Sequence, residues 1–197
     1  MRRLLTLLAV AFLLSSCSST RVVTQWRDPA TTQLRFSKVL ALCIAKEQSL
    51  RRAAEGELCK QISSVECKPA YLAVPDSMID KDKQDEAKAL VTRSGFDGAV
   101  VVRVVDVREK VTYVPPTYGP TFWGYYGYAW PMAYDPGYYR TDQILRLETS
   151  IYSLTQDQLL WVGTTETVNP KSLPETIEEV AKAIREELQE DHLIPSR

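Results

Sequence analysis

Ala99-Val-Val-Val-Arg-Val-Val-Asp-Val-Arg-Glu-Lys-Val-Thr-Tyr113 is the stretch of sequence that decides the fold. Its first part, Val100–Val102, is continuously apolar, as expected of a strand that is covered on both faces. Its second part, Val105–Arg108, alternates valine with charged residues, which indicates one face in contact with water. The stretch therefore predicts one long strand that runs from the interior of a sheet to a half-exposed end.

The sequence before this strand predicts an alternation of strands and helices. The expected elements are an extended segment at Val22–Trp26, a strand at Val39–Ala45, a helix at Ser49–Ile62, a strand at Cys67–Val74 and a helix at Asp82–Ser94 that ends at Gly95. The helical segments carry apolar residues at helical spacing, and residues 39–45 form a short apolar run. Because helices connect them, the neighbouring strands are expected to be parallel.

The sequence after residue 142 predicts an antiparallel hairpin and a last helix. Gln143–Leu154 alternates apolar with polar residues, and Leu159–Val168 is its expected partner strand. Ser172 and Glu175 form a capping box for a helix that continues to residue 190. The predicted fold class is α/β (α+β), a single mixed sheet of about five to six strands with three helices mainly on one face.

A long aromatic hairpin loop is expected at residues 113–139. It holds 11 aromatic residues, with 8 tyrosines to 1 phenylalanine, and no charge occurs between Lys110 and Asp135. The residues that form the candidate interaction surface are Tyr118, Phe122, Trp123, Tyr125, Tyr126, Tyr128, Trp130 and Tyr134. Three outcomes stay open: the loop covers the open sheet face, it meets a partner protein or another copy, or it touches membrane headgroups or glycan.

The N-terminus predicts export and a lipid anchor. Arg2-Arg3 precedes Leu4–Leu14, a charge-free apolar run of 11 residues. This run is typical of a signal peptide and too short for a membrane-spanning helix of roughly 20 residues. Leu14-Ser15-Ser16-Cys17 resembles the bacterial lipobox, which implies removal of residues 1–16 and lipidation of Cys17.

The lipobox resemblance sets the expected organisation of the mature chain. Residues 17–21 are the lipidated cysteine and a tether, residues 22–190 a single α/β domain, and residues 191–197 a tail. The resemblance implies a diacylglyceryl thioether and an N-acyl chain such as palmitate, and two or more chains anchor a protein stably. Ser18 implies, by similarity to the lipoprotein sorting pattern, a place in the cell envelope on the periplasmic face of the outer membrane.

The charge balance excludes one class of partner. The chain has 24 Lys and Arg against 25 Asp and Glu, and loss of Arg2 and Arg3 leaves a net charge of −3. No basic patch in the sequence indicates a nucleic-acid partner. The expected partners are the membrane, through the lipid anchor, and an envelope protein or a second copy, with glycan as an alternative.

No residue pattern indicates catalysis, a metal or a cofactor. Nucleophilic catalysis needs a base beside the nucleophile, and the single histidine, His192, falls in the expected tail. Asp97 is expected to be a turn residue. Cys59 and Cys67 are close enough in sequence for a disulfide in an exported chain, with unpaired buried thiols as the alternative, and Cys43 is expected in the core. The chain is therefore expected to be a non-catalytic protein without a cofactor.

The order of several short motifs resembles small bacterial envelope lipoproteins of unknown function. The motifs are Trp26-Arg27-Asp28-Pro29, Phe36–Leu40, the Arg51, Arg52 and Glu55 group, Gly95–Val101 and Ile151–Trp161. The layout is also similar to the α/β lobes of curli-secretion-type and TolB N-terminal-type proteins, at the level of fold only. The resemblance implies a binding or scaffold module in an envelope assembly, with a glycan- or peptidoglycan-contacting lipoprotein as the alternative.

The lipobox resemblance generates the first testable prediction. Cys17→Ser removes the thiol that would carry the diacylglyceryl group, so the protein should leave the detergent phase in a phase-partition assay and lose labelling by radioactive fatty acid. A Cys17→Ser protein that still takes up the label would contradict the lipid anchor.

Overall fold

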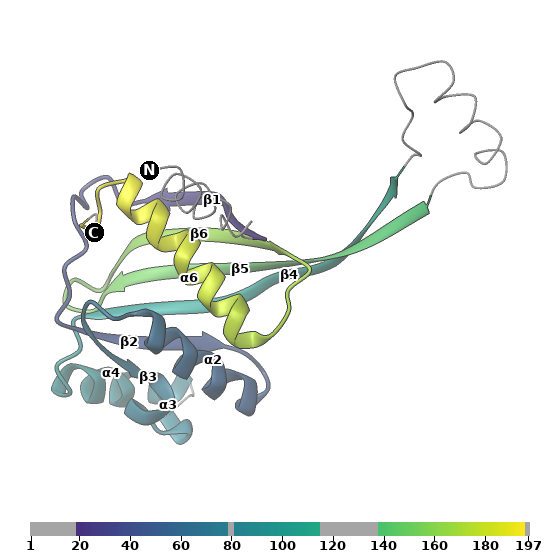
Figure 1. Ribbon diagram of the computed structural model, residues 1–197. Helices are drawn as coiled ribbons and strands as arrows, with labels where there is room; N and C mark the ends of the chain where they lie inside the picture. Colours follow the sequence, from purple (N-terminus) through teal and green to yellow (C-terminus); the bar gives the residue numbers. More distant parts are fainter. Residues whose placement is uncertain (1–18, 79–80, 115–137, 196–197) are drawn as a thin grey trace, which may run out of the picture.

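The computed structural model describes residues 19–78, 81–114 and 138–195 (Figure 1). Its strands are β1 (Thr20–Arg27), β2 (Lys38–Ile44), β3 (Glu66–Pro69), β4 (Gly98–Val114), β5 (Tyr138–Ser153) and β6 (Gln158–Val168). Its helices are α2 (Gln48–Gln61), α3 (Ala70–Ala73), α4 (Gln84–Arg93) and α6 (Leu173–Glu190), with short 3₁₀ turns η1 (Asp76–Met78) and η2 (Lys81–Lys83).

The six strands form one mixed sheet in the order β1-β6-β5-β4-β2-β3. β4 pairs with β2, and β2 with β3, in parallel, as the helical crossovers predict. The pairs β1–β6, β6–β5 and β5–β4 are antiparallel. The α+β class with a single mixed sheet is therefore confirmed, and the stretch at 99–113 is its long central strand, β4.

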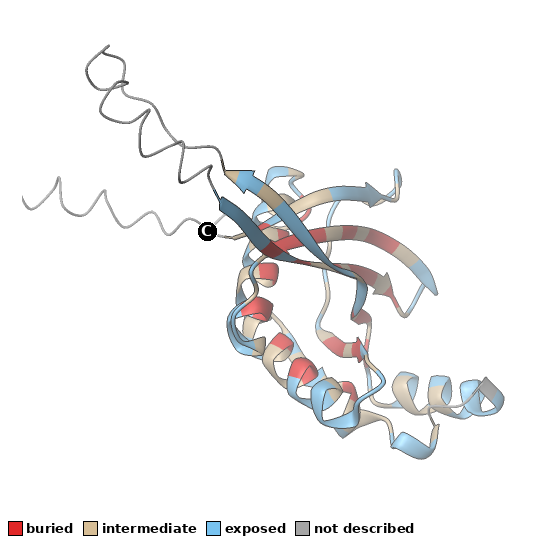
Figure 2. Ribbon diagram, turned by 90° about the vertical axis from the view of Figure 1, so that its right-hand side faces the viewer, coloured by how far each residue is buried: buried red, intermediate tan, exposed pale blue. Residues whose placement is uncertain are grey.

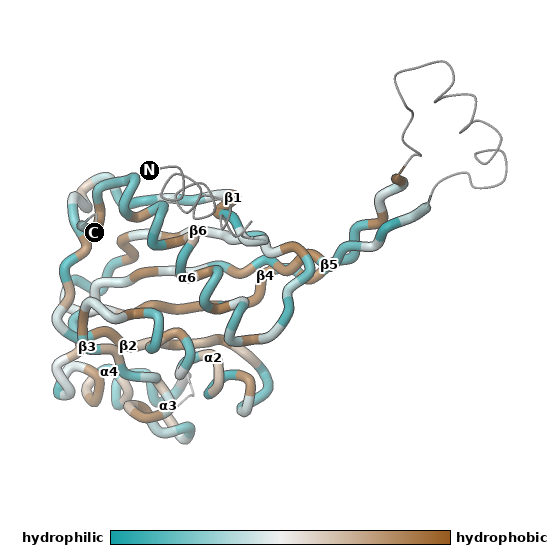
Figure 3. Tube along the Cα trace, viewed as in Figure 1, coloured by the Kyte–Doolittle hydropathy of each residue, from teal (hydrophilic) through white to brown (hydrophobic). Residues whose placement is uncertain are grey.

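The two faces of the sheet have separate cores. α2 and α6 cover one face (Figure 1), where Trp161 and Leu193 are fully buried among residues from both helices and from β2, β4, β5 and β6. On the other face, α3 and α4 cover only the part of the sheet near β2, around Leu40, Phe96 and Ala99. Apolar residues concentrate in the central strands of the sheet (Figure 3). The described residues form four α-helices, where three were expected.

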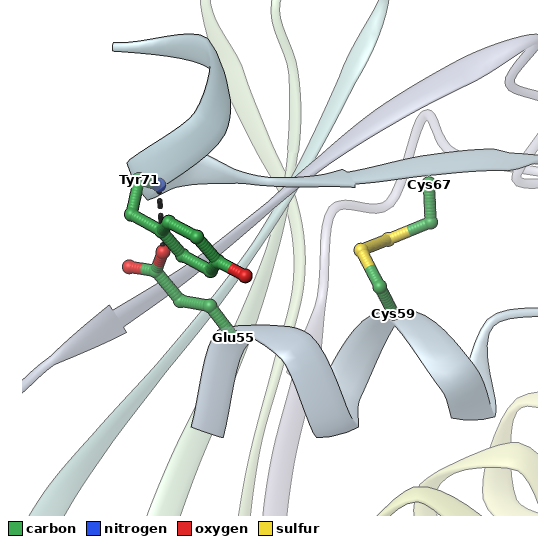
Figure 4. Close-up of a disulfide and its surroundings, with 4 residues drawn as sticks. All are labelled: Glu55, Cys59, Cys67 and Tyr71. Carbon is green, nitrogen blue, oxygen red and sulfur yellow. Dashed lines mark hydrogen bonds between the residues drawn. A yellow bond between two sulfur atoms is a disulfide. The ribbon is translucent and has the colours of Figure 1, made fainter. Parts of the chain in front are cut away.

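The expected strand at Cys67–Val74 is wrong beyond Pro69. Pairing of β3 with β2 ends at the Ala41–Pro69 pair, and the chain then turns into α3. The physical reason is a buried acid on α2. Glu55 has no exposed surface, and its carboxylate accepts a hydrogen bond from the backbone N–H of Cys43 at 3.2 Å. It also accepts the backbone N–H of Tyr71 at 2.8 Å (Figure 4). The N–H of Tyr71 therefore donates to a side chain and not to a neighbouring strand.

Cys59 and Cys67 form a disulfide, with their Cα atoms 5.3 Å apart. Cys59 lies about one turn after Glu55 on α2, so the disulfide and the Glu55 carboxylate together hold one side of α2 against β3 and α3 (Figure 4). Cys43 is buried with a free thiol, in the core position expected from the sequence.

Asp97 fixes the ends of three strands, which agrees with its expected role in a turn. Its carboxylate accepts from the backbone N–H of Ser37 at 2.7 Å and of Lys38 at 2.9 Å. Its own N–H donates to the Lys38 carbonyl, and its carbonyl accepts from the N–H of Leu154. Partial burial raises the pKa of this carboxyl, but the hydrogen bonds from Ser37 and Lys38 outweigh burial and hold it below its usual value.

Two boundaries differ from the sequence expectation. β1 begins at Thr20, so the expected tether at 17–21 loses Thr20 and Arg21 to the sheet. Residues 191–195 of the expected tail pack on the domain, because Leu193 is fully buried and its carbonyl accepts the N–H of Leu34 at 2.8 Å.

The Asp97 contacts predict a pH-dependent loss of stability. In Asp97→Asn one of the two backbone N–H groups loses its acceptor, so the free energy of unfolding at pH 7 should fall by about 1 to 3 kcal/mol. The pKa of Asp97 is lower in the folded than in the unfolded protein, so its stabilisation is complete above about pH 4 and disappears as the pH falls further. Urea unfolding at neutral and acidic pH measures this difference.

The matched control for this experiment is Asp85→Asn, because Asp85 is exposed in the first turn of α4. The control should change stability little at either pH. A gap between wild type and Asp97→Asn that stayed constant into acid would contradict the proposed role of the Asp97 charge.

Candidate functional site

β4 and β5 extend beyond the rest of the sheet as a two-stranded ribbon. β2 pairs with β4 as far as Arg103, and β6 pairs with β5 from Ile144 onward. Beyond these points, within the described part of the chain, residues 104–114 of β4 pair only with β5, and residues 138–143 of β5 pair only with β4. We call this ribbon the arm. It projects from one end of the sheet (Figure 1), and its outer half is exposed (Figure 2).

One face of the arm is mainly apolar, and its charged member is Glu109, which lies opposite Gln143. Val107, Val111 and Tyr113 alternate along β4 and lie opposite Leu145, Thr141 and Tyr139 of β5, respectively. The exposed fractions are 69% for Val107, 61% for Val111, 47% for Tyr113 and 75% for Tyr139. The rings of Tyr113 and Tyr139 lie 5.5 Å apart, centre to centre. Leu145 packs against the main core, so the apolar face of the arm continues the core face of the sheet beyond the helix layer.

The other face of the arm carries basic side chains above buried acids. Glu166 is paired with Arg21 at 3.2 Å, Arg146 at 2.7 Å and Arg108 at 3.6 Å, so one carboxylate meets guanidinium groups from three strands. The side chain of Glu166 is 9% exposed, whereas that of Arg21 is 75% and that of Arg108 is 51% exposed. Hydrogen bonding to Arg146 is the main reason that the pKa of Glu166 lies below its usual value.

The next acid along this face is covered in the same way. Asp142 has a side chain 6% exposed, beneath Arg140 at 61%, and the two groups are 2.9 Å apart. The amide of Asn169 also donates to Asp142, and this bond is the main reason that the pKa of Asp142 is lowered. Lys110 lies directly opposite Asp142 and is exposed. We call Arg21, Arg108, Lys110 and Arg140 the basic face.

The first described residues are fixed to the sheet and to α6. The Ser19 carbonyl accepts the N–H of Val168 at 3.1 Å. The hydroxyls of Ser19 and Thr20 both donate to the carboxylate of Glu179, each at 2.8 Å, and Thr20 also bonds Thr167. We call these contacts the N-terminal clasp. They lower the pKa of Glu179, through the Ser19 bond first. Val168 ends β6 at the base of the arm, so the clasp and the arm share one end of the sheet.

Two cavities lie away from the arm. One, of about 560 Å³, lies between α4 and the sheet and is lined by Leu40, Leu42, Val91, Ala99, Tyr152 and Leu154, among others. The other, of about 310 Å³, lies between α2, α6 and the sheet. Cys43 borders the larger cavity, and burial raises the pKa of its thiol to about 11, so the reactive thiolate is scarce at neutral pH. Within the described ranges, no group of three or more acids, cysteines or histidines could hold a metal ion.

Of the sequence-predicted site residues, Cys59 and Cys67 lie in the described part of the chain and form a disulfide. Cys17 and the eight aromatic residues from Tyr118 to Tyr134 lie outside the described residues. Tyr138 and Tyr139, assigned to the aromatic loop by the sequence, belong to β5 instead. Tyr113, where the predicted strand meets the predicted loop, lies in β4. The sequence expectation missed the basic face and the N-terminal clasp.

A signal for the missed start of β5 was present in the sequence. A strand that ends near Tyr113 needs a partner of similar length, and this partner has to begin well before Gln143. No comparable signal exists for the clasp, because its members are far apart in the chain.

None of the helices that the structure describes is long and apolar enough to cross a membrane.

Comparisons with known proteins show a distant likeness of fold. No known protein family and no curated protein sequence matches the chain. A PelC variant from Paraburkholderia phytofirmans, solved as a dodecamer, is similar with 9% identity and a TM-score of 0.44, over 84% of this chain and 94% of that one. A second PelC dodecamer from this organism gives 11% identity and a TM-score of 0.42, over 90% and 99%. Lipoprotein GNA1162 from Neisseria meningitidis gives 10% identity and a TM-score of 0.37, over 78% and 99%.

The clasp predicts a local change when Glu179 is removed. In Glu179→Ala the hydroxyls of Ser19 and Thr20 lose a charged acceptor, which costs about 1.5 kcal/mol of local stability and should speed exchange of the Val168 amide proton roughly tenfold. Hydrogen–deuterium exchange measures this rate. Glu178→Ala is the matched control. Glu178 directly precedes Glu179, is exposed, and makes none of the clasp contacts given above. Equal exchange rates in the two variants would contradict the clasp.

Proposed function

We propose that this protein is a lipid-anchored, non-catalytic binding module of the cell envelope, and that the arm is its binding element. The observation that supports the proposal most is the apolar face of the arm. Val107, Val111, Tyr113 and Tyr139 are all at least 47% exposed. They share one face of a ribbon that no described helix covers.

The exposed apolar face has an energetic cost that a partner would remove. Burial of apolar surface contributes about 25 cal/mol per Å², and a two-stranded ribbon alone is only marginally stable in water. Tyrosine is also among the residues that dominate binding energy at protein interfaces, because its ring is apolar and its hydroxyl stays wet. A protein surface that packs on the arm would therefore gain affinity from residues that make few contacts within this chain.

The aromatic residues of the candidate interaction surface follow the apolar face of the arm in the sequence. Tyr118–Tyr134 connects the two arm strands, so the candidate interaction surface and the apolar face of the arm are contiguous in sequence. We propose that they serve the same partner, an envelope protein or a second copy of this chain. The alternative, a glycan or peptidoglycan partner, rests on the same aromatic residues.

The non-catalytic part of the proposal rests on the chemistry of the described residues. The paired acids described here, Glu166, Asp142 and Asp97, all have lowered pKa values and are satisfied by arginine, amide or backbone donors. A general acid or base near neutral pH needs the opposite shift. Cys43 has a raised pKa and is therefore a poor nucleophile.

Replacing the arm valines tests the proposal. A photo-crosslinking amino acid at Val111, introduced in living cells, should capture one product of defined mass, either twice the chain or the chain plus one protein. Val107→Ser in the same protein should weaken the interaction roughly tenfold, because a buried valine contributes about 1.5 kcal/mol. The yield of the crosslinked band measures the effect.

The matched control is Leu72→Ser, because Leu72 is an apolar side chain that is 59% exposed on α3, far from the arm. This control should leave the yield unchanged. A crosslinking yield that does not fall in Val107→Ser, or that falls equally in Leu72→Ser, would contradict the arm as the binding element. Loss of binding to isolated sacculi, with protein crosslinks intact, would support the glycan alternative.

A further inference from the structure

We infer that the basic face lies on the anionic phospholipid headgroups of the membrane that holds Cys17. The inference rests on the lipid anchor of the proposed function. It adds an orientation for the domain and a second contact with the bilayer, which the anchor alone does not require.

The first step is the short distance between the anchor and the folded domain. Ser19 is held by the Val168 N–H and by the Glu179 carboxylate. Cys17 is only two residues earlier, and an extended chain spans at most about 3.5 Å per residue. The Cα atom of a lipidated Cys17 is therefore within roughly 7 Å of Ser19. The end of the sheet that contains the clasp is then held at the membrane surface.

The second step is the place of the basic face relative to the clasp. Arg21 is two residues after Ser19, and across the sheet it lies in line with Glu166 and Arg146. Arg108 reaches the same Glu166 carboxylate from β4, and Lys110 and Arg140 follow outward along the arm. The basic face therefore begins beside the anchor and continues along one side of the arm.

The third step is the sign of the outward charge. Glu166 and Asp142 are the buried members of their pairs, and Asp106, 3.6 Å from Arg108, is 40% exposed, whereas Arg21, Arg108 and Arg140 are at least half exposed. The mature chain has a net charge of −3, counted from Cys17 onward, so overall composition does not explain a cationic surface here. At physiological salt, charges attract over a Debye length of about 8 Å, a distance similar to the reach of the anchor.

These three steps together favour lipid over other anions. The basic face could attract an acidic polysaccharide or protein, but the anchor keeps anionic headgroups beside it at high local concentration. Each basic residue close to an anionic membrane surface strengthens association roughly fivefold. The apolar face of the arm stays available for a protein partner, because the two faces point in opposite directions.

Lysine footprinting of the lipidated full chain tests the inference. The protein is reconstituted in phosphatidylethanolamine vesicles with or without phosphatidylglycerol, and acetylation rates at Lys110 and Lys88 are measured by mass spectrometry. Lys88 is the internal control, because its side chain is 62% exposed and contacts Asp157 at the opposite end of the sheet. Phosphatidylglycerol should slow acetylation of Lys110 severalfold and leave Lys88 unchanged, and high salt should reverse the protection.

A variant makes the test specific to the basic face. Arg108→Gln should restore most of the labelling of Lys110 in phosphatidylglycerol vesicles, whereas Arg93→Gln, which removes an exposed charge from α4, should not. Equal labelling of Lys110 in the two kinds of vesicle would overturn the inference, as would equal protection of Lys88. Flotation with phosphatidylethanolamine vesicles reports the lipid anchor separately, so failure of the anchor and failure of the basic face give different results.

Discussion

The antiparallel pairing of β4 with β5 is the constraint on which the rest of the structure depends. The two strands pair from Gly98–Ser153, beside the Asp97 contacts, to Val114–Tyr138 at the tip of the described arm. At one end their side chains form the centre of both cores, and at the other end they leave the sheet as the arm. A ribbon that would be marginal alone is thus continuous with two strands buried in a six-stranded sheet.

The same pairing gives the arm two unlike faces. Side chains alternate across a strand. Val107, Val111, Tyr113 and Tyr139 therefore share the face of the main core with Glu109, and Arg108, Lys110 and Arg140 share the other face with Tyr138. The arginines are held by buried carboxylates from neighbouring strands, Glu166 above all. These ion pairs order long side chains near the clasp. The fold thereby places an apolar surface, a cationic surface and the clasp at one end of the sheet.

The sequence was informative where the signal was local and periodic. The alternation at Val105–Arg108 predicted a long half-exposed strand, and the structure contains it as β4. The strand expected at Cys67–Val74 ends early because the backbone N–H of Tyr71 donates to Glu55, which lies 16 positions earlier in the chain. The start of β5 was missed because tyrosine, glycine and proline around Gly137 suggested a loop. The clasp joins Ser19 to Glu179, which are 160 positions apart. No sequence pattern at either residue predicts that contact.

The central claim is that the clasp sets the domain on the membrane with the arm end facing the bilayer. Paramagnetic broadening of backbone amide signals by a spin-labelled lipid headgroup tests this claim most directly in the lipidated protein. The account predicts strong broadening at Thr20, Arg108 and Thr112, and little at Thr92 on α4, at the far end of the sheet. Broadening that is equal at all these sites, or strongest at Thr92, would contradict it.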